Sequence, residues 1–162
     1  MQNESSDNFA LGRTDENSLS ADDPTLPARV RELIRIGNVG IAKEDNAALA
    51  AFFHPQFRFH GPNGELNREQ LWNYFAACRA AFDDFTVTRQ AVVSDGGDYL
   101  ATRTRFAGVF ARPFTGLPGG ALRPNGKRFE YRVINIFRYA PNGQLLEEWV
   151  QYDTAAFLAQ LR

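Results

Sequence analysis

The C-terminal half of the chain carries four strand-like segments in succession, and this feature most restricts the fold. Each segment is rich in Val, Thr and aromatic residues, and the four cover residues 85–94, 99–110, 127–139 and 143–153. The turn sequences Asp95-Gly-Gly-Asp98 and Asn142-Gly143 separate two pairs of them, since tight hairpins need residues that tolerate positive φ. The pattern therefore predicts a meander of antiparallel strands.

Helical patterns come before this meander. Apolar residues recur every three or four positions over residues 28–41, and a second, short helix is predicted over 46–53. Asn67 and Gln70 form a capping-box pattern at the start of a third helix, which follows a short strand over 57–60. Helices grouped before an antiparallel sheet are typical of an α+β fold.

The length and the charge distribution indicate one globular domain behind an acidic tail. Residues 1–24 are polar and carry six acids against one arginine, so we expect a disordered tail before a domain of residues 25–162. The other residues carry 17 bases and 13 acids, a net charge of +4 that is scattered along the chain. This scatter argues against nucleic-acid binding.

Other compositional features set expectations for location and cofactors. No apolar run is long enough for a membrane span or a secretory signal, so we expect a cytoplasmic protein that does not enter a membrane. Cys78 is the only cysteine, and no metal-ligand spacing is present. We therefore expect neither a disulfide within the chain nor a metal site.

The last predicted strand places a carboxylate in register with a tryptophan. With a period of two, Glu147, Trp149, Gln151 and Asp153 share one face, and the opposite face carries Leu146, Glu148, Val150 and Tyr152. From this alternation we expect Trp149 and Asp153 to point together into an apolar cavity.

Several segments together resemble a known family. They are Ala51-Phe-Phe-His-Pro-Gln-Phe-Arg-Phe-His60, the helix after Asn67, Asn125-Gly-Lys127, Ile134-Asn-Ile-Phe-Arg138, and the end of the chain with Glu147-Glu-Trp149, Asp153 and Gln160-Leu161. In order and spacing they resemble the SnoaL-like polyketide cyclases of the nuclear-transport-factor-2-like superfamily. The resemblance implies a cone-shaped α+β barrel, in which a curved, mostly antiparallel sheet wraps around three helices from the N-terminal half.

The same resemblance implies an enzyme of the cyclase or isomerase type. Asp153 would be the general acid/base, acting without a cofactor or metal on a small hydrophobic, polyketide-like molecule. The superfamily also implies a homodimer. Two departures are visible: Val109-Phe110 stands where these sequences often have a histidine, and the connection over residues 115–127 is longer than usual.

Each candidate residue also has a simpler interpretation. Asp153 is a favoured N-cap for a C-terminal helix, and His60 is either a second catalytic group at the pocket border or a surface histidine beside a turn. Asn135 would orient a substrate carbonyl or hydrogen-bond a neighbouring strand, and Trp149 would wall the cavity or pack in the core. The remaining expected substrate contacts are Phe110, Tyr131 and Tyr74.

Two other functions remain open from the sequence. One is a non-catalytic module on the same fold, either for hydrophobic ligands or for dimerisation. The other keeps an enzyme but changes the reaction to that of a dehydratase or an epoxide hydrolase. An interior Arg103 paired with Asp153 would favour the hydrolase.

Overall fold

The helices lie mostly in the first half of the chain. The computed structural model describes residues 11–12 and 18–162. Within these residues the helical segments are α1 (Ala28–Arg35), which continues into a π-helix η1 (Ile36–Ile41), then α2 (Asn46–Phe52), α3 (Arg68–Ala81) and α4 (Thr154–Gln160).

Seven strands in the described residues form one mixed sheet. They are β1 (Leu11–Gly12), β2 (Phe53–Gly61), β3 (Gly64–Asn67), β4 (Phe82–Ser94), β5 (Tyr99–Phe110), β6 (Arg128–Tyr139) and β7 (Leu145–Tyr152). Their order in the sheet is β1-β4-β5-β6-β7-β2-β3. Every neighbouring pair is antiparallel except β2 and β7, which are parallel. Within the described residues the two edge strands, β1 and β3, do not pair with each other, so the sheet does not close.

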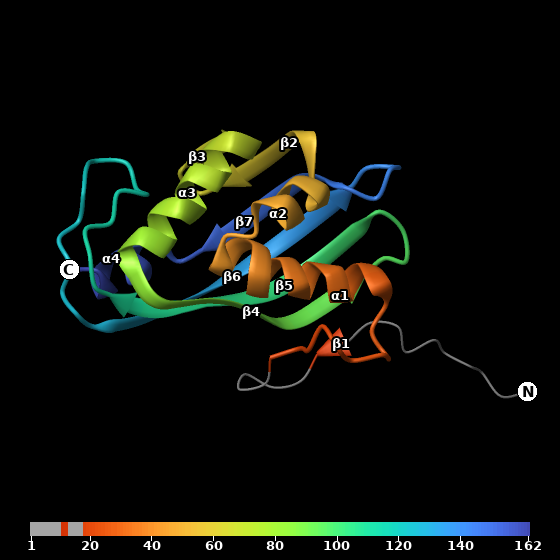
Figure 1. The fold of residues 1–162 in the computed structure, drawn as a ribbon, viewed down its shortest axis with the longest axis horizontal. Helices are drawn as coiled ribbons and strands as arrows, with labels where there is room; N and C mark the ends of the chain where they lie inside the picture. The colour runs from red at the N-terminus through yellow and green to blue at the C-terminus, as the bar shows by residue number, and fades with distance from the viewer. Residues whose placement is uncertain (1–10, 13–17) are drawn as a thin grey trace, which may run out of the picture.

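Helices α1, α2 and α3 cover one face of the curved sheet, as Figure 1 shows. The predicted α+β cone is therefore confirmed, with an open sheet. The four strands of the predicted meander are also confirmed as β4 to β7. The capping box at Asn67 is present too: its Oδ1 accepts from Gln70 N at 2.9 Å, and Gln70 Oε1 accepts from Asn67 N at 2.9 Å.

The sequence interpretation was less accurate around β2 and β3. Helix α2 ends at Phe52, and β2 starts at Phe53 and not at the predicted residue 57. The strand tolerates Pro55 because its pairing with β7 shifts register between Phe53 and Arg58, so a missing N–H is accommodated there. The short strand β3 has no clear alternation and was not predicted.

Residues of the predicted tail partly contact the domain. Strand β1 pairs with β4, and Leu19 N donates to Arg89 O at 2.8 Å. The rest of the disorder prediction, for residues 1–10 and 13–17, lies outside the described residues. Among the described helices, none is both long and apolar enough to cross a bilayer.

The π-helix brings the backbone of the first helical segment close to β4. Gly37 lies so close that a Cβ built there would be 3.2 Å from Val87 O and 3.7 Å from Arg89 Nε. π-helical turns are uncommon and occur frequently at functional sites. Here η1 also supplies Ile36 and Ile41, two residues that line the interior cavity described below.

We predict that Gly37→Ala destabilises the protein by about 1–2 kcal/mol, because the added methyl must displace the β4 backbone. The matched control is Gly97→Ala in the β4–β5 turn, where the nearest atom outside the adjacent residues would be 3.5 Å away. Urea denaturation of both variants measures the difference. Equal stability of the two variants would contradict the close packing of η1 on β4.

Candidate functional site

A cavity of about 280 Å³ lies between the inner face of the sheet and the helical segments η1, α2 and α3. Its lining is mostly apolar and aromatic, including Phe52, Phe53, Phe75, Phe106 and Phe137. The exposed lining residues lie in two places: Pro62, Asn63 and Gly64 where β2 turns into β3, and Thr115 and Pro118 in the β5–β6 connection. The mouth of the cavity therefore lies between the β2–β3 turn and the long β5–β6 connection. Ligand pockets in proteins usually have this apolar, concave form.

Strands β6 and β7 determine which polar groups reach the cavity. In β6 the buried face carries Tyr131, Val133, Asn135 and Phe137, as the alternation predicts. Residue Asn135 pairs with Val150 of β7, and Phe137 pairs with Glu148. Because paired residues share a face of the sheet, Glu148 points inward and Trp149 points outward.

The inward polar groups form one chain of hydrogen bonds at the closed end of the cavity. Arg89 Nη1 donates to Thr104 Oγ1 at 2.7 Å, and Thr104 Oγ1 donates to Asn135 Oδ1 at 2.9 Å. Thr102 Oγ1 also donates to Asn135 Oδ1, at 3.1 Å. Asn135 Nδ2 then donates to Glu148 Oε1 at 2.7 Å. The two threonine donors fix the orientation of the Asn135 amide, so its NH₂ group faces the carboxylate.

Glu148 is a buried acid whose pKa is raised, so it holds its proton more tightly than an exposed glutamate does. The residue is 7% exposed, and it lines the cavity. Burial raises the pKa of Glu148 to about 7, although the Arg89 charge and the Asn135 hydrogen bond both oppose this rise. A carboxylate with a pKa near neutrality can both accept and return a proton at physiological pH.

Arg89 is the buried cation that accompanies this acid. Burial lowers the pKa of Arg89, and the negative charge of Glu148 acts in the opposite direction. The guanidinium carbon also lies 5.3 Å from the centre of the Phe137 ring. Arg89 is among the cavity-lining residues, so it can stabilise negative charge that develops on a bound molecule.

Three tyrosines line the cavity away from the Glu148 end. Tyr74 comes from α3, Tyr131 from β6 and Tyr152 from the end of β7. The hydroxyl oxygens of Tyr74 and Tyr131 are 3.5 Å apart. Burial raises the pKa of both groups well above the usual value, so both are protonated at neutral pH.

The structure places three of the predicted substrate contacts at the cavity. Asn135, Tyr131 and Tyr74 all line it, as the sequence indicated. Phe110 does not line it. The Phe110 side chain is fully buried in an aromatic cluster, where its ring centre is 5.6 Å from that of Phe82.

Trp149 and His60 lie on the outer side of the sheet. The expectation that Trp149 points into the cavity is therefore wrong. Their rings stack at 5.3 Å between centres, and His60 Nε2 is 2.8 Å from Glu147 Oε1. None of these three residues lines the cavity. The outer face also exposes Ile134 and Ile136. The homodimer stays a prediction.

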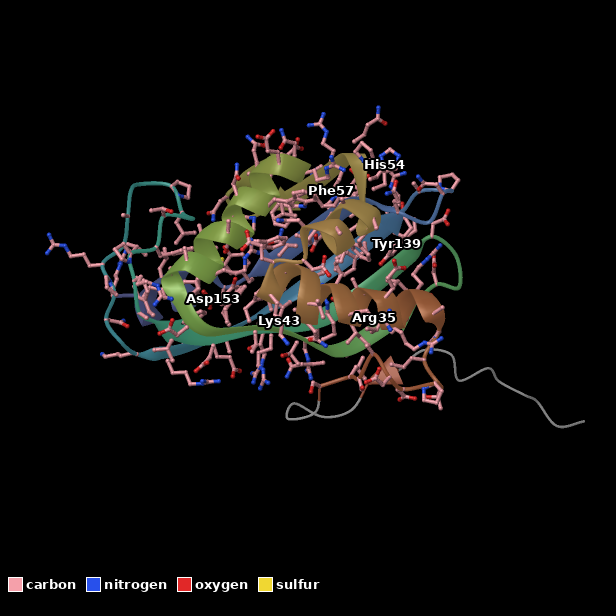
Figure 2. All side chains as sticks on the ribbon, in the orientation of Figure 1. Arg35, Lys43, His54, Phe57, Tyr139 and Asp153 are labelled. Carbon is pink, nitrogen blue, oxygen red and sulfur yellow. The ribbon has the colours of Figure 1, made fainter. Side chains whose placement is uncertain are left out.

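Asp153 also lies outside the lining of the cavity. Its Oδ1 accepts from Ala156 N at 2.9 Å, so it is the N-cap of α4. Figure 2 labels Asp153 near one end of the sheet and Tyr139 near the other. The expectation that Asp153 points into the cavity beside Trp149 is therefore corrected. Arg103 is paired in register with the exposed Ile134, so it does not lie inside the cone either.

Sequence reasoning missed Arg89, Glu148 and Tyr152. The sequence does contain a signal for Arg89. Phe85, Val87 and Arg89 occupy alternate positions of β4, so Arg89 lies on the same face as two apolar residues. For β7 the useful signal is that Val150 and Tyr152 share the Glu148 face, whereas Gln151 lies on the Trp149 face. The sequence favours the Trp149 face as the interior one, whereas Trp149 pairs with the exposed Ile136 on the outer face.

No part of the described chain brings together three or more His, Cys, Asp or Glu side chains in a way that would hold a metal ion. Cys78 is buried on α3, and burial raises the pKa of its thiol to about 12. At neutral pH this thiol is therefore protonated and unreactive.

The sequence model of the SnoaL-like polyketide cyclase family matches residues 34–161. No curated protein sequence matches the chain. Among solved structures, IdmH of Streptomyces antibioticus, a proposed polyketide cyclase, is 26% identical with a TM-score of 0.68, covering 83% of this chain and 99% of its own.

Two more distant structures share the fold. A SnoaL-like polyketide cyclase of Agrobacterium tumefaciens is 17% identical with a TM-score of 0.63, covering 85% of this chain and 100% of its own. A protein of Catenulispora acidiphila with a ketosteroid isomerase-like fold is 18% identical with a TM-score of 0.60, covering 84% and 93%.

We predict that Glu148 makes the folded state less stable as pH rises from 4.5 to about 7. Over this range the unfolded chain releases the proton and the folded chain keeps it, so the free energy of unfolding falls. A rise of the Glu148 pKa from 4.5 to about 7 on folding corresponds to a fall of about 3 kcal/mol in the free energy of unfolding. Below pH 4.5 Glu148 is protonated in both states. Urea denaturation across this range should show a fall in wild type that Glu148→Gln lacks. Parallel pH profiles of the two proteins would contradict a raised pKa for Glu148.

We predict that Asp153→Ala lowers stability by about 1 kcal/mol through loss of the helix cap. The matched variant Asp153→Asn keeps stability close to wild type, because Asn also caps helices well. Thermal unfolding of both variants measures this. A large loss of stability in the Asn variant would show that the charge of Asp153, and not its capping bond, matters to the fold.

Proposed function

Because the chain belongs to the SnoaL-like polyketide cyclase family, we propose that it is a cofactor-independent cyclase or isomerase with Glu148 as general acid/base. Its substrate would be a hydrophobic, polyketide-like or polycyclic carbonyl compound held in the cavity. Support for this class of substrate comes from the aromatic lining and from the small number of polar groups in it.

One observation carries the proposal: among the described residues, a single buried carboxylate lines the apolar cavity, at its closed end and with a pKa of about 7. Within the described residues, Asn135 is the hydrogen-bond donor to this carboxylate and uses only Oε1. The second oxygen of Glu148 is thus available to a substrate. A dry site increases the basicity of a carboxylate toward a carbon acid, because water no longer stabilises its charge.

The chemistry follows from these groups. The Glu148 carboxylate takes a proton from a carbon next to a substrate carbonyl, and the electrons of the broken C–H bond form an enolate. Arg89 stabilises the negative charge on the enolate. The enolate carbon then attacks a second carbonyl carbon of the same molecule and closes a ring. The oxygen of that carbonyl takes up the proton from Glu148, which restores the carboxylate.

Isomerisation would need the same first step. The proton held by Glu148 returns to a different carbon of the enolate, so one group serves as both base and acid. Asn135 would position Glu148 in both reactions, since its amide is held by Thr102 and Thr104 and its NH₂ group holds the carboxylate. Asp153 remains the alternative acid/base residue implied by family resemblance.

We predict that Glu148→Gln slows proton abstraction at least about 100-fold, because general-base catalysis typically contributes this much. The assay is exchange of the α-hydrogens of 2-tetralone, a hydrophobic ketone, for deuterium in D₂O by NMR. The wild-type rate should rise with pH around pH 7, where Glu148 loses its proton.

Two variants serve as matched controls in this assay. Glu147→Gln removes the neighbouring carboxylate on the opposite face of β7 and should exchange at the wild-type rate. Asp153→Asn should do the same. Loss of exchange in Asp153→Asn but not in Glu148→Gln would assign the acid/base role to Asp153. Binding of 2-tetralone to wild type without any exchange would favour a ligand-binding protein.

A further inference from the structure

The cavity has a second group of polar atoms that the proposed proton transfer does not use. The hydroxyls of Tyr74 and Tyr131 approach each other where α3 faces β6. Tyr131 precedes Asn135 by four residues in β6, and Tyr152 follows Glu148 by four residues in β7. At about 3.3 Å per residue, the tyrosine end of the cavity lies about 13 Å along the strands from the Glu148 end.

The two hydroxyls are only loosely bonded to each other. Their oxygens are 3.5 Å apart, whereas a good hydrogen bond between hydroxyls is about 2.7–2.8 Å long. Both are protonated, so the pair holds two protons, and a bond between them uses only one. The Tyr74 side chain also has a hydrogen bond with the Cys78 thiol, whose sulfur is only a weak acceptor. An acceptor oxygen placed beside the pair can take a hydrogen bond from each hydroxyl.

The surroundings hold these hydroxyls in place. The Tyr131 ring is stacked on Phe106, with centres 5.0 Å apart and planes at 9°, and its centre is 4.1 Å from that of Phe157. On the helix side, a Cβ at Gly116 would lie 3.1 Å from Cδ2 of the Tyr74 ring, so the β5–β6 connection packs closely on Tyr74. A fixed pair of donors in an apolar environment binds an oxygen more strongly than the same groups in water.

We propose that the Tyr74–Tyr131 hydroxyl pair is a second oxygen-binding subsite, which holds a carbonyl or phenolic oxygen of the substrate remote from Glu148. This inference rests on the proposed function and specifies its substrate class: an extended, flat molecule with oxygen functions toward both ends. Binding of the distal oxygen would determine which carbon of the substrate lies at Glu148. The pair therefore selects and orients the substrate, and Glu148 performs the proton transfer.

The test compares two fluorescent probes of nearly equal shape, 2-naphthol and 2-methylnaphthalene, which differ in a hydroxyl and a methyl group. Titrations are made with wild type and with Tyr131→Phe, Tyr74→Phe and Glu148→Gln. We expect each Tyr→Phe variant to bind 2-naphthol about fivefold more weakly, the effect of one hydrogen bond. Affinity for 2-methylnaphthalene should be unchanged, which also shows that the variants are folded.

Three results would overturn the subsite. One is an equal loss of affinity for both probes, which indicates changed packing alone. Another is unchanged binding of 2-naphthol in both Tyr→Phe variants. The third is a loss for 2-naphthol only in Glu148→Gln, which places the probe oxygen at the other end. These titrations need no turnover, so they are independent of the exchange assay that tests Glu148 as the base.

Discussion

The alternation of side chains in the central strands is the constraint on which both the core and the site depend. Each residue of β6 faces either the helices or the outside, and a register shift of one position would exchange the two sets. The same inward set packs Phe129 and Phe137 into the core and presents Asn135 to the cavity. Fold and site are therefore not separable along this strand, and the site is built from positions that would otherwise carry core residues.

Burial of Glu148 shows what this arrangement costs the fold. A carboxylate in an apolar cavity loses hydration, and its raised pKa reflects that loss. The chain from Arg89 through Thr104 and Asn135 offsets part of it with a charge and with donors held in fixed positions. These interactions do not fully offset the loss of hydration, so the pKa of Glu148 stays raised, as suits an acid/base group. The local loss of stability therefore supports the chemistry we propose.

The sequence predicted the fold more reliably than the site. The strands β4 to β7, the capped helix α3 and the family were all recognisable, because they depend on local periodicity and on short motifs. The sequence did not reveal which face of β7 points toward the cavity. Alternation puts Glu148 and Trp149 on opposite faces of the strand, but it does not say which face points to the cavity. The aromatic side chain of Trp149 suggested the wrong face as the interior one. Only the pairing of Phe137 with Glu148 and of Ile136 with Trp149 resolves it.

By itself the sequence determined the order of elements, the period of each strand and the presence of a helix cap at Asp153. Those properties arise from neighbours within a few residues, so they survive without a tertiary structure. The assembly of Arg89, Asn135 and Glu148 was decided only by tertiary structure, since these residues come from three strands. Their meeting depends on strand order, on register and on the face that the helices cover, and none of these is contained in a local pattern.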